Sequence, residues 1–306
     1  MGKYLIRRFL ASIPVFWGLM TATFLMIHLL PGDPAVIMLG FALTDERVES
    51  LRAELGLNEP LYVQYGRYTL NLLRGDMGRS MSKSAPVATL IRQQVPATVQ
   101  LAVAGLGCSL LLGLVLGVFT AKYHRTWVDT TGMFVALAGV SMPSFWLGLL
   151  LIITFSVHLK WVPIVGTGGI GRLILPAVAL GFGSAGMVAR LVRSGMLEVL
   201  RQDYVLTARA KGLRERVVLY RHALKNALIP VVTVVGVQFG RLLSGAVVVE
   251  SVFGREGLGR MLVDAIRVHD IPLVQGIVLV TSVSYVAVNL LVDLSYSLLD
   301  PRINYP

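Results

Sequence analysis

The sequence predicts an all-α integral membrane protein with six transmembrane helices and a small helical extracytoplasmic region between the first and second spans. Of its 306 residues, 55% are hydrophobic and only 15% are charged, whereas about 25% are charged in soluble domains. Several apolar runs also reach the length of about 20 residues that crosses a bilayer as a helix. Together, composition and run length place the chain in the membrane.

The first apolar run, Phe9–Leu30, follows Lys3, Arg7 and Arg8. It is longer than the roughly 7–15-residue core of a signal peptide, and no small-x-small cleavage site follows it. We therefore expect residues 1–32 to form a retained transmembrane helix with its N-terminus in the cytoplasm, with a cleaved signal peptide as the alternative.

Residues 33–96 are too polar to span a membrane, and they predict a small helical region outside it. Thr44-Asp45-Glu46 begins a helix that ends near Gly56. A second helix begins at Pro60 and ends near Gly75, and Val87–Gln94 predicts a third. The seven Lys and Arg of this region are compatible with the outer side, because the positive-inside rule weakens for loops beyond about 60 residues.

Residues 97–306 predict a core of five further spans: Thr98–Thr120, Met133–Val157, Leu173–Val192, Leu228–Val249 and Leu273–Leu299. Pro143 interrupts the second of these spans and predicts a kink. The short turn 122–125 and the loop 193–227 are basic, whereas 159–172 and 250–271 predict outer loops. This bias of Lys and Arg places both termini in the cytoplasm.

Several kinds of chemistry have no support in the sequence. The net charge of +11 collects in loops predicted to be cytoplasmic, so it does not indicate a nucleic-acid partner. Phosphate-loop, metal-ligand and catalytic motifs are missing, and Cys108 lies alone in an apolar run. Gly181-x-Gly183-x-x-Gly186 matches a dinucleotide fingerprint only by letter, because no strand precedes it. We interpret these glycines, with Gly113-x-x-x-Gly117, as close helix packing.

The cytoplasmic loop 193–227 contains the strongest local signal for a partner. From Arg190 to Lys225 the chain has nine Lys and Arg against three acidic residues. Asp203 is suited to the N-cap of a short helix, Tyr204–Lys211, and Gly212 to the left-handed position after its end. The small residues Thr207, Ala208 and Ala210 leave room for another surface, so we expect this helix to dock a cytoplasmic partner.

Polar residues inside predicted spans are costly in hydrocarbon and therefore informative. Gln238 and Arg241 lie three residues apart in the fifth span, and Asn289 and Asp293 lie four apart in the sixth. One interpretation is a translocation path lined by Gln238, Arg241 and Asn289. The other is a structural pair, in which Arg241 and Asp293 neutralise each other.

The docking segment resembles the membrane subunits of bacterial ATP-binding-cassette (ABC) importers. Those subunits share a loop of the form Glu-Ala-Ala-x-x-x-Gly, matched in part by Leu206-Thr207-Ala208-x-x-x-Gly212. The variant Thr-Ala-Arg-Ala-Lys-Gly-Leu is closer to the first (B-type) subunit of the dipeptide/oligopeptide/nickel permeases. Further agreements are Leu30-Pro31-Gly32-Asp33-Pro34, Gly75-Asp76-Met77-Gly78, Val249-Glu250-Ser251-Val252-Phe253 and Asp300-Pro301-Arg302. Arg255-Glu256 departs from the Trp-Pro that is common there.

The resemblance implies a specific assembly in the bacterial cytoplasmic membrane, within lipid. A C-type permease would pair with this chain, two cytoplasmic ATPases would bind ATP and Mg²⁺, and an extracytoplasmic binding protein would deliver cargo. The chain itself would be no enzyme and would hold no cofactor or metal. The coupling residues implied are Asp203, Tyr204, Thr207, Ala208, Arg209, Ala210, Lys211, Gly212 and Leu213.

The cargo implied is a di- or oligopeptide, including glutathione-like peptides, moved inward by alternating access. Arg241 favours a peptide carboxylate over a bare divalent cation. A nickel or metal-chelate importer is the alternative within the family. An intramembrane enzyme would need a catalytic pair that we do not find, and a stand-alone channel would not need the basic docking loop.

Overall fold

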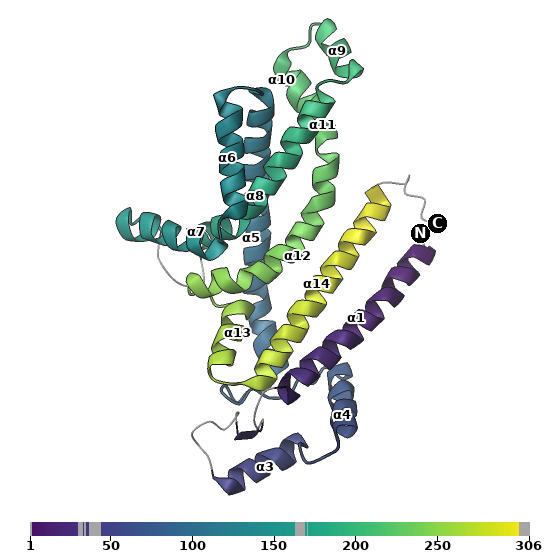
Figure 1. Ribbon diagram of the computed structural model, residues 1–306, viewed down its shortest axis with the longest axis vertical. Coiled ribbons are helices and arrows are strands. Elements are labelled where there is room, and N and C mark those ends of the chain that lie inside the picture. The colour runs from purple at the N-terminus through teal and green to yellow at the C-terminus, as the bar shows by residue number, and fades with distance from the viewer. Residues whose placement is uncertain are drawn as a thin grey trace. The chain divides into compact units, whose positions relative to one another are not determined.

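The described part of the chain is helical, which confirms the predicted all-α fold (Figure 1). The computed structural model describes residues 2–29, 33, 35–36, 44–162, 169 and 171–299. Within these residues the extended pairing is limited to one isolated bridge, between Arg79 and Pro86. The chain divides into two compact units, residues 97–256 and residues 1–96 with 257–306. Helix α5 (Val87–Lys122) contributes to both.

The unit formed by residues 97–256 is built around α8 (Gly171–Val199), which contacts most of the other helices of this unit. Its neighbours are α6 (Trp127–Ser141), α7 (Ser144–Leu151), α11 (Leu224–Ala227) and α12 (Ile229–Val252). Buried aliphatic residues line these contacts, among them Val188, Val192 and Met196 of α8. The basic loop therefore leaves and re-enters one packed group of helices.

Small residues allow the close approach of helices to α8, as the glycine pattern predicts. A Cβ atom on Gly186 would lie 2.2 Å from the carbonyl oxygen of Ala136 in α6. One on Gly181 would lie 2.3 Å from the carbonyl oxygen of Gly105 in α5, and one on Gly113 would lie 2.6 Å from Val188. The interpretation of these glycines as packing positions is confirmed.

The kink predicted at Pro143 is a sharp break. Helices α6 and α7 meet at 109° across the gap between Ser141 and Ser144. Met142 is extended, with φ −84° and ψ 126°, as expected for a residue that precedes proline. The chain then continues through α7 into the π-helix η1 (Ile152–His158).

The other unit packs α1 (Gly2–His28) against α14 (Ile271–Leu299) and α4 (Leu61–Leu73). The hydroxyls of Thr23 and Tyr68 lie 2.8 Å apart. Gln275 Nε2 donates to the carbonyl oxygen of Thr23 at 2.6 Å. Side-chain hydrogen bonds thus join three helices from the two ends of the chain.

Two of the three helices predicted in residues 33–96 are confirmed. Helix α3 (Asp45–Leu55) begins after Thr44 and ends at Gly56, which has φ +68°, and α4 begins after Pro60. The third, Val87–Gln94, is wrong as a separate helix, because it forms the first turns of α5, which continues through Pro96. The sequence changes from polar to apolar near Pro96, but the helix does not end there.

The simple outer loop predicted for residues 250–271 is also wrong, because it contains α13 (Leu258–Arg267). Leu258, Met261 and Ala265 on one face of α13 are buried against residues of α5 and α14 that include Ile91 and Ile277. The neighbouring glycines indicate a loop in the sequence, but this apolar spacing of three and four residues is that of a helix face.

Four helices are long and apolar enough to cross a membrane: Val87–Lys122, Gly171–Val199, Ile229–Val252 and Ile271–Val292. A fifth results if the bent pair α6 and α7–η1 is one span, and Leu10–Met26 forms a shorter apolar helix. The count of six, the orientation of the termini and the division into 1–32, 33–96 and 97–306 stay predictions.

Candidate functional site

The short helix predicted in the basic loop is confirmed as α9 (Asp203–Ala210). It begins one residue earlier than expected, so the prediction of Asp203 as N-cap is wrong. Gln202 is the N-cap, since it is extended and its carbonyl oxygen accepts from the amides of Val205 and Leu206 at 3.0 and 3.3 Å. Asp203 lies in the first turn, where the helix dipole still favours an anion.

The end of α9 is a Schellman motif built on Gly212. The amide of Gly212 donates to the carbonyl oxygen of Arg209 at 2.9 Å, and that of Leu213 donates to Ala208 at 3.3 Å. Gly212 has φ +78°, the left-handed conformation that glycine adopts most easily. The predicted role of Gly212 in ending the helix is confirmed.

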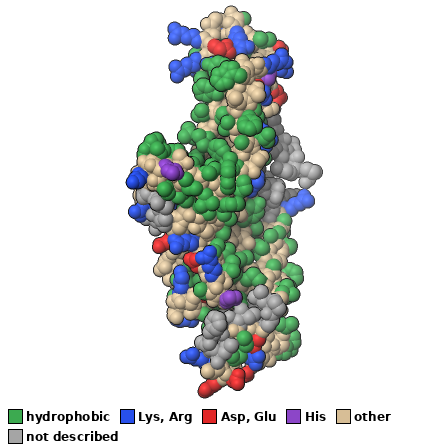
Figure 2. Space-filling model, turned by 60° about the vertical axis from the view of Figure 1, so that its left-hand side comes forward, with side chains coloured by type: hydrophobic (Ala, Val, Ile, Leu, Met, Phe, Trp, Pro, Cys, Tyr) green, Lys and Arg blue, Asp and Glu red, His purple; other side chains and the backbone are tan. Residues whose placement is uncertain are grey.

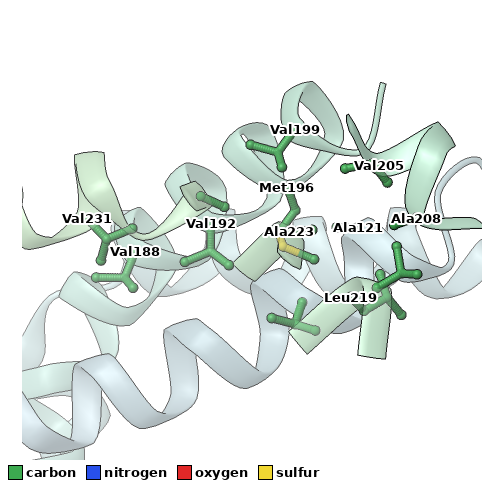
Figure 3. Packing of buried hydrophobic residues seen from close by; sticks show 13 residues of the cluster. Ala121, Val188, Val192, Met196, Val199, Val205, Ala208, Leu219, Ala223 and Val231 are labelled. Carbon is green, nitrogen blue, oxygen red and sulfur yellow. The ribbon is translucent and has the colours of Figure 1, made fainter. Parts of the chain in front are cut away.

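The inner face of α9 is held by two buried side chains, Val205 and Ala208, which are 0% and 7% exposed. They belong to a cluster with Met196 and Val199 of α8 and with Leu219 (Figure 3). Val205 is absent from the predicted coupling residues, although its spacing of three from Ala208 places both on one face. The remaining coupling candidates are exposed: Asp203, Tyr204, Thr207, Arg209, Ala210, Lys211, Gly212 and Leu213.

Side-chain contacts near both ends of α9 join it to the helical run that follows, which consists of α10 (Glu215–Val217), η2 (Val218–Ala223) and α11. Near one end, Asn226 Nδ2 donates to the Tyr204 hydroxyl at 2.7 Å. At the other, Arg209 Nη2 and Nε donate to the Glu215 carboxylate at 2.8 and 3.2 Å. This ion pair lowers the pKa of Glu215 and raises that of Arg209.

The outer surface of this region combines cations with exposed apolar side chains. Leu206 and Leu213 are 53% and 40% exposed. A hollow of about 380 Å³ is lined by Arg216, Val217, Tyr220 and Arg221. Figure 2 shows Lys and Arg side chains gathered at the end of the molecule that carries α9. Such a surface suits a protein partner that offers acidic groups beside an apolar pocket.

An ion pair between the buried Asp129 and the half-buried Arg193 holds together the helices from which this region extends. Arg193 of α8 donates to both carboxylate oxygens of Asp129 in α6, from Nε at 2.6 Å and Nη2 at 2.8 Å. The same carboxylate accepts from the amide of Arg125 at 3.1 Å. The basic turn 122–125 and the end of α8 are therefore joined next to the segment that leads into α9.

The three path candidates have different surroundings. Gln238 is buried, and its Nε2 donates to the sulfur of Met187 at 3.1 Å. Arg241 is exposed on α12, and Asn289 is half-buried on α14, in the other unit. The side chain of Asp293 lies outside the described residues, so its pairing with Arg241 stays a prediction.

Membrane-length helices and an exposed, capped helix on a basic loop are typical of a multi-pass membrane protein with a docking element. Family models give the class as a transport permease. Residues 113–305 match the model of the binding-protein-dependent transport system inner membrane component, and residues 1–102 match the N-terminal model of such membrane components. The chain belongs to this family, and within it to the ABC-importer permeases of the peptide/nickel group.

Named relatives resemble the chain over its full length. It is 44% identical over 313 residues to a putative peptide transport system permease of Brucella abortus, which covers 100% of both chains. A glutathione transport system permease of Pectobacterium atrosepticum is 43% identical over 305 residues, and a dipeptide transport system permease of Alkalihalophilus pseudofirmus is 42% identical over 333. Both also cover 100% of each chain.

A solved structure shares the fold. It is the crystal structure of an amino acid ABC transporter with histidines, with a TM-score of 0.52 and 18% sequence identity. The match covers 67% of this chain and 92% of that chain. At this identity the likeness concerns the fold alone.

Proposed function

We propose that the chain is the first (B-type) permease subunit of an ATP-driven importer for di- and oligopeptides, including glutathione-like peptides. The observation that carries the proposal is α9, a short helix whose two ends are capped or clamped while its outer face is exposed. The relatives named for peptide, dipeptide and glutathione transport support the cargo.

In this proposal α9 is the element through which ATP hydrolysis acts on the permease. Two cytoplasmic ATPases bind ATP and Mg²⁺, and one of them receives the exposed face of α9. Closure of the ATPase pair moves α9, and the Val205 and Ala208 contacts with α8 transmit the movement to the spans. This chain performs no chemistry, and its spans reorient around a path shared with a C-type permease.

The location and orientation follow from the same assignment. The chain crosses the bacterial inner membrane several times, with both termini and α9 in the cytoplasm. The extracytoplasmic side, which includes residues 33–96, receives cargo from a substrate-binding protein. A metal-chelate cargo is the alternative that the experiment must exclude.

The test is reconstitution of this permease in proteoliposomes with its C-type partner, both ATPases and the binding protein. We expect di- and tripeptides to stimulate ATP hydrolysis and to accumulate inside, whereas nickel chelates do neither. If nickel chelates stimulate hydrolysis and peptides do not, the chain is instead a permease of a metal-chelate importer. Absence of any stimulated hydrolysis by the intact complex would contradict the importer assignment itself.

A further inference from the structure

Two arginines lie within the neighbouring helices α8 and α12, Arg190 toward the predicted inner end of α8 and Arg241 near the middle of α12. Arg190 precedes the last residue of α8, Val199, by nine positions, and Arg241 follows the first residue of α12, Ile229, by twelve. At 1.5 Å per residue, they lie about 14 and about 18 Å from the helix ends that join the basic loop. Arg241 lies too far from either end of α12 to leave the membrane easily, whereas Arg190 lies two residues before Val192, the predicted inner end of its span.

Both side chains are exposed, and neither has a hydrogen bond or ion pair within the part of the chain that the structure describes. Arg193, one turn beyond Arg190, differs because it is paired with Asp129. A charged side chain facing lipid at mid-membrane is costly. The face of α12 that carries Arg241 is therefore expected to border water or a polar partner and not lipid.

Helix geometry places the two arginines on the same side of the α8–α12 pair. The contact between Gln238 Nε2 and Met187 Sδ, at 3.1 Å, marks where the helices touch. Arg190 and Arg241 each follow a contact residue by three positions, a turn of about −60° around the helix. Because α8 and α12 run in opposite directions (Figure 1), these two rotations point to one side. Along the axes, the arginines are separated by about 9 Å.

We propose that Arg190 and Arg241 form one anion-binding site on the translocation path and that its ligands are the carboxylates of the peptide cargo. This inference rests on the proposed function. The planar guanidinium group binds a carboxylate through two parallel hydrogen bonds. Two such groups on one side of the α8–α12 pair suit a peptide that carries an acidic side chain besides its C-terminal carboxylate. A cationic peptide or a bare divalent cation is repelled.

The test uses the reconstituted complex and three tripeptides with a neutral, a Glu or a Lys central residue, chosen for equal affinity to the binding protein. Uptake of each is measured with the wild-type chain, R190Q, R241Q and the double variant. The ratio of Glu-peptide to Lys-peptide uptake is expected to fall by about tenfold for each substitution, the size of a charge-assisted hydrogen bond. R190K and R241K keep the charge and should restore much of the ratio.

The matched control is R92Q, which removes an exposed arginine from the polar start of α5 and should leave the ratio unchanged. An unchanged ratio in the double variant overturns the site while leaving the importer assignment intact. Loss of the C-type partner from purified R190Q or R241Q complexes also overturns it, because the guanidinium then holds a protein carboxylate. A wild-type complex that transports no peptide contradicts the proposed function instead.

Discussion

Gly212 and Gly75 share the left-handed conformation, but only Gly212 ends α9. Gly75 is therefore a matched control for substitutions at Gly212. Their φ angles are +78° and +81°, and a Cβ atom on either would meet nothing within 4 Å. Alanine in this conformation costs about 1–2 kcal/mol. We predict that Gly212→Ala lowers peptide uptake per ATP hydrolysed, because it disturbs the end of α9, whereas Gly75→Ala leaves this ratio unchanged. Equal ratios in both variants would remove Gly212 from the coupling mechanism.

Asp270 is a buried carboxylate that joins distant parts of one unit. Its Oδ2 accepts from the Ser80 and Ser82 hydroxyls at 2.5 and 2.7 Å, and its Oδ1 accepts from the amide of Leu273 at 3.3 Å. Burial raises the pKa of Asp270, but these hydrogen bonds outweigh it, so the pKa lies below its ordinary value. The charged carboxylate is therefore the form that stabilises the fold.

We predict that Asp270→Ala lowers the free energy of unfolding by about 2 kcal/mol, since it leaves the buried Ser80 hydroxyl without its acceptor. A lowered pKa means that the contribution is present above about pH 4 and is lost as the pH falls through the folded-state pKa. Thermal unfolding of the purified protein at decreasing pH measures both effects. The variant should lose less stability on acidification than the wild type, and parallel curves would contradict this role.

At the scale of elements, α9 and the helical run that follows it behave as one clamped piece. The Arg209–Glu215 pair is largely exposed, with side chains 39% and 54% accessible, so its contribution to stability is within about 1 kcal/mol. We expect the pair to matter because it holds α9 to the helical run that follows. We predict that R209E and E215R each reduce uptake per ATP and that the double variant R209E/E215R recovers most of it.

The charge-swapped pair distinguishes two roles of Arg209. Recovery shows that Arg209 acts by holding α9 to Glu215. Failure of the double variant to recover, with R209E as defective as before, would show that Arg209 contacts the ATPase directly. Tyr204→Phe is a companion variant, since it removes the hydroxyl that accepts from Asn226 and keeps the ring.

Local patterns predicted the elements whose signals lie within a few residues. Gly212, the Pro143 break and the helices after Thr44 and Pro60 follow from backbone preferences, and the structure confirms them. The start of α9 was misplaced because Gln202, a weaker capping residue than Asp203, is the one with extended backbone. Helix α13 was missed because flanking glycines masked its apolar face.

Local sequence patterns could not predict the side-chain contacts that complete the candidate site. Arg209 and Glu215 are six residues apart, a spacing at which no helix rule pairs side chains, and they meet because the chain turns at Gly212. Asp129 and Arg193 are separated by 64 residues along the chain. Only the packing of α6 against α8 brings them together. Neither pair has a signal within the sequence that could have found it.

For the whole molecule, membership of the permease family and the structure of α9 lead to one central claim. We propose that energy from a partner ATPase enters this chain at the outer face of α9 and passes inward through Val205 and Ala208. The residues on that face differ sharply in accessibility from their neighbours: Leu206 is 53% exposed, and the adjacent Val205 is 0% exposed. This contrast makes the claim testable at the level of single positions.

The most direct test is photo-crosslinking from single positions in the assembled transporter. A photoreactive residue at Leu206 or Ala210 is expected to crosslink to an ATPase subunit, more strongly in the presence of ATP. The control position is Lys160, exposed in the predicted outer loop, which should give no ATPase adduct. We expect ATPase adducts from the α9 positions and none from Lys160, and assembled complexes without adducts from either α9 position would contradict the coupling role of α9.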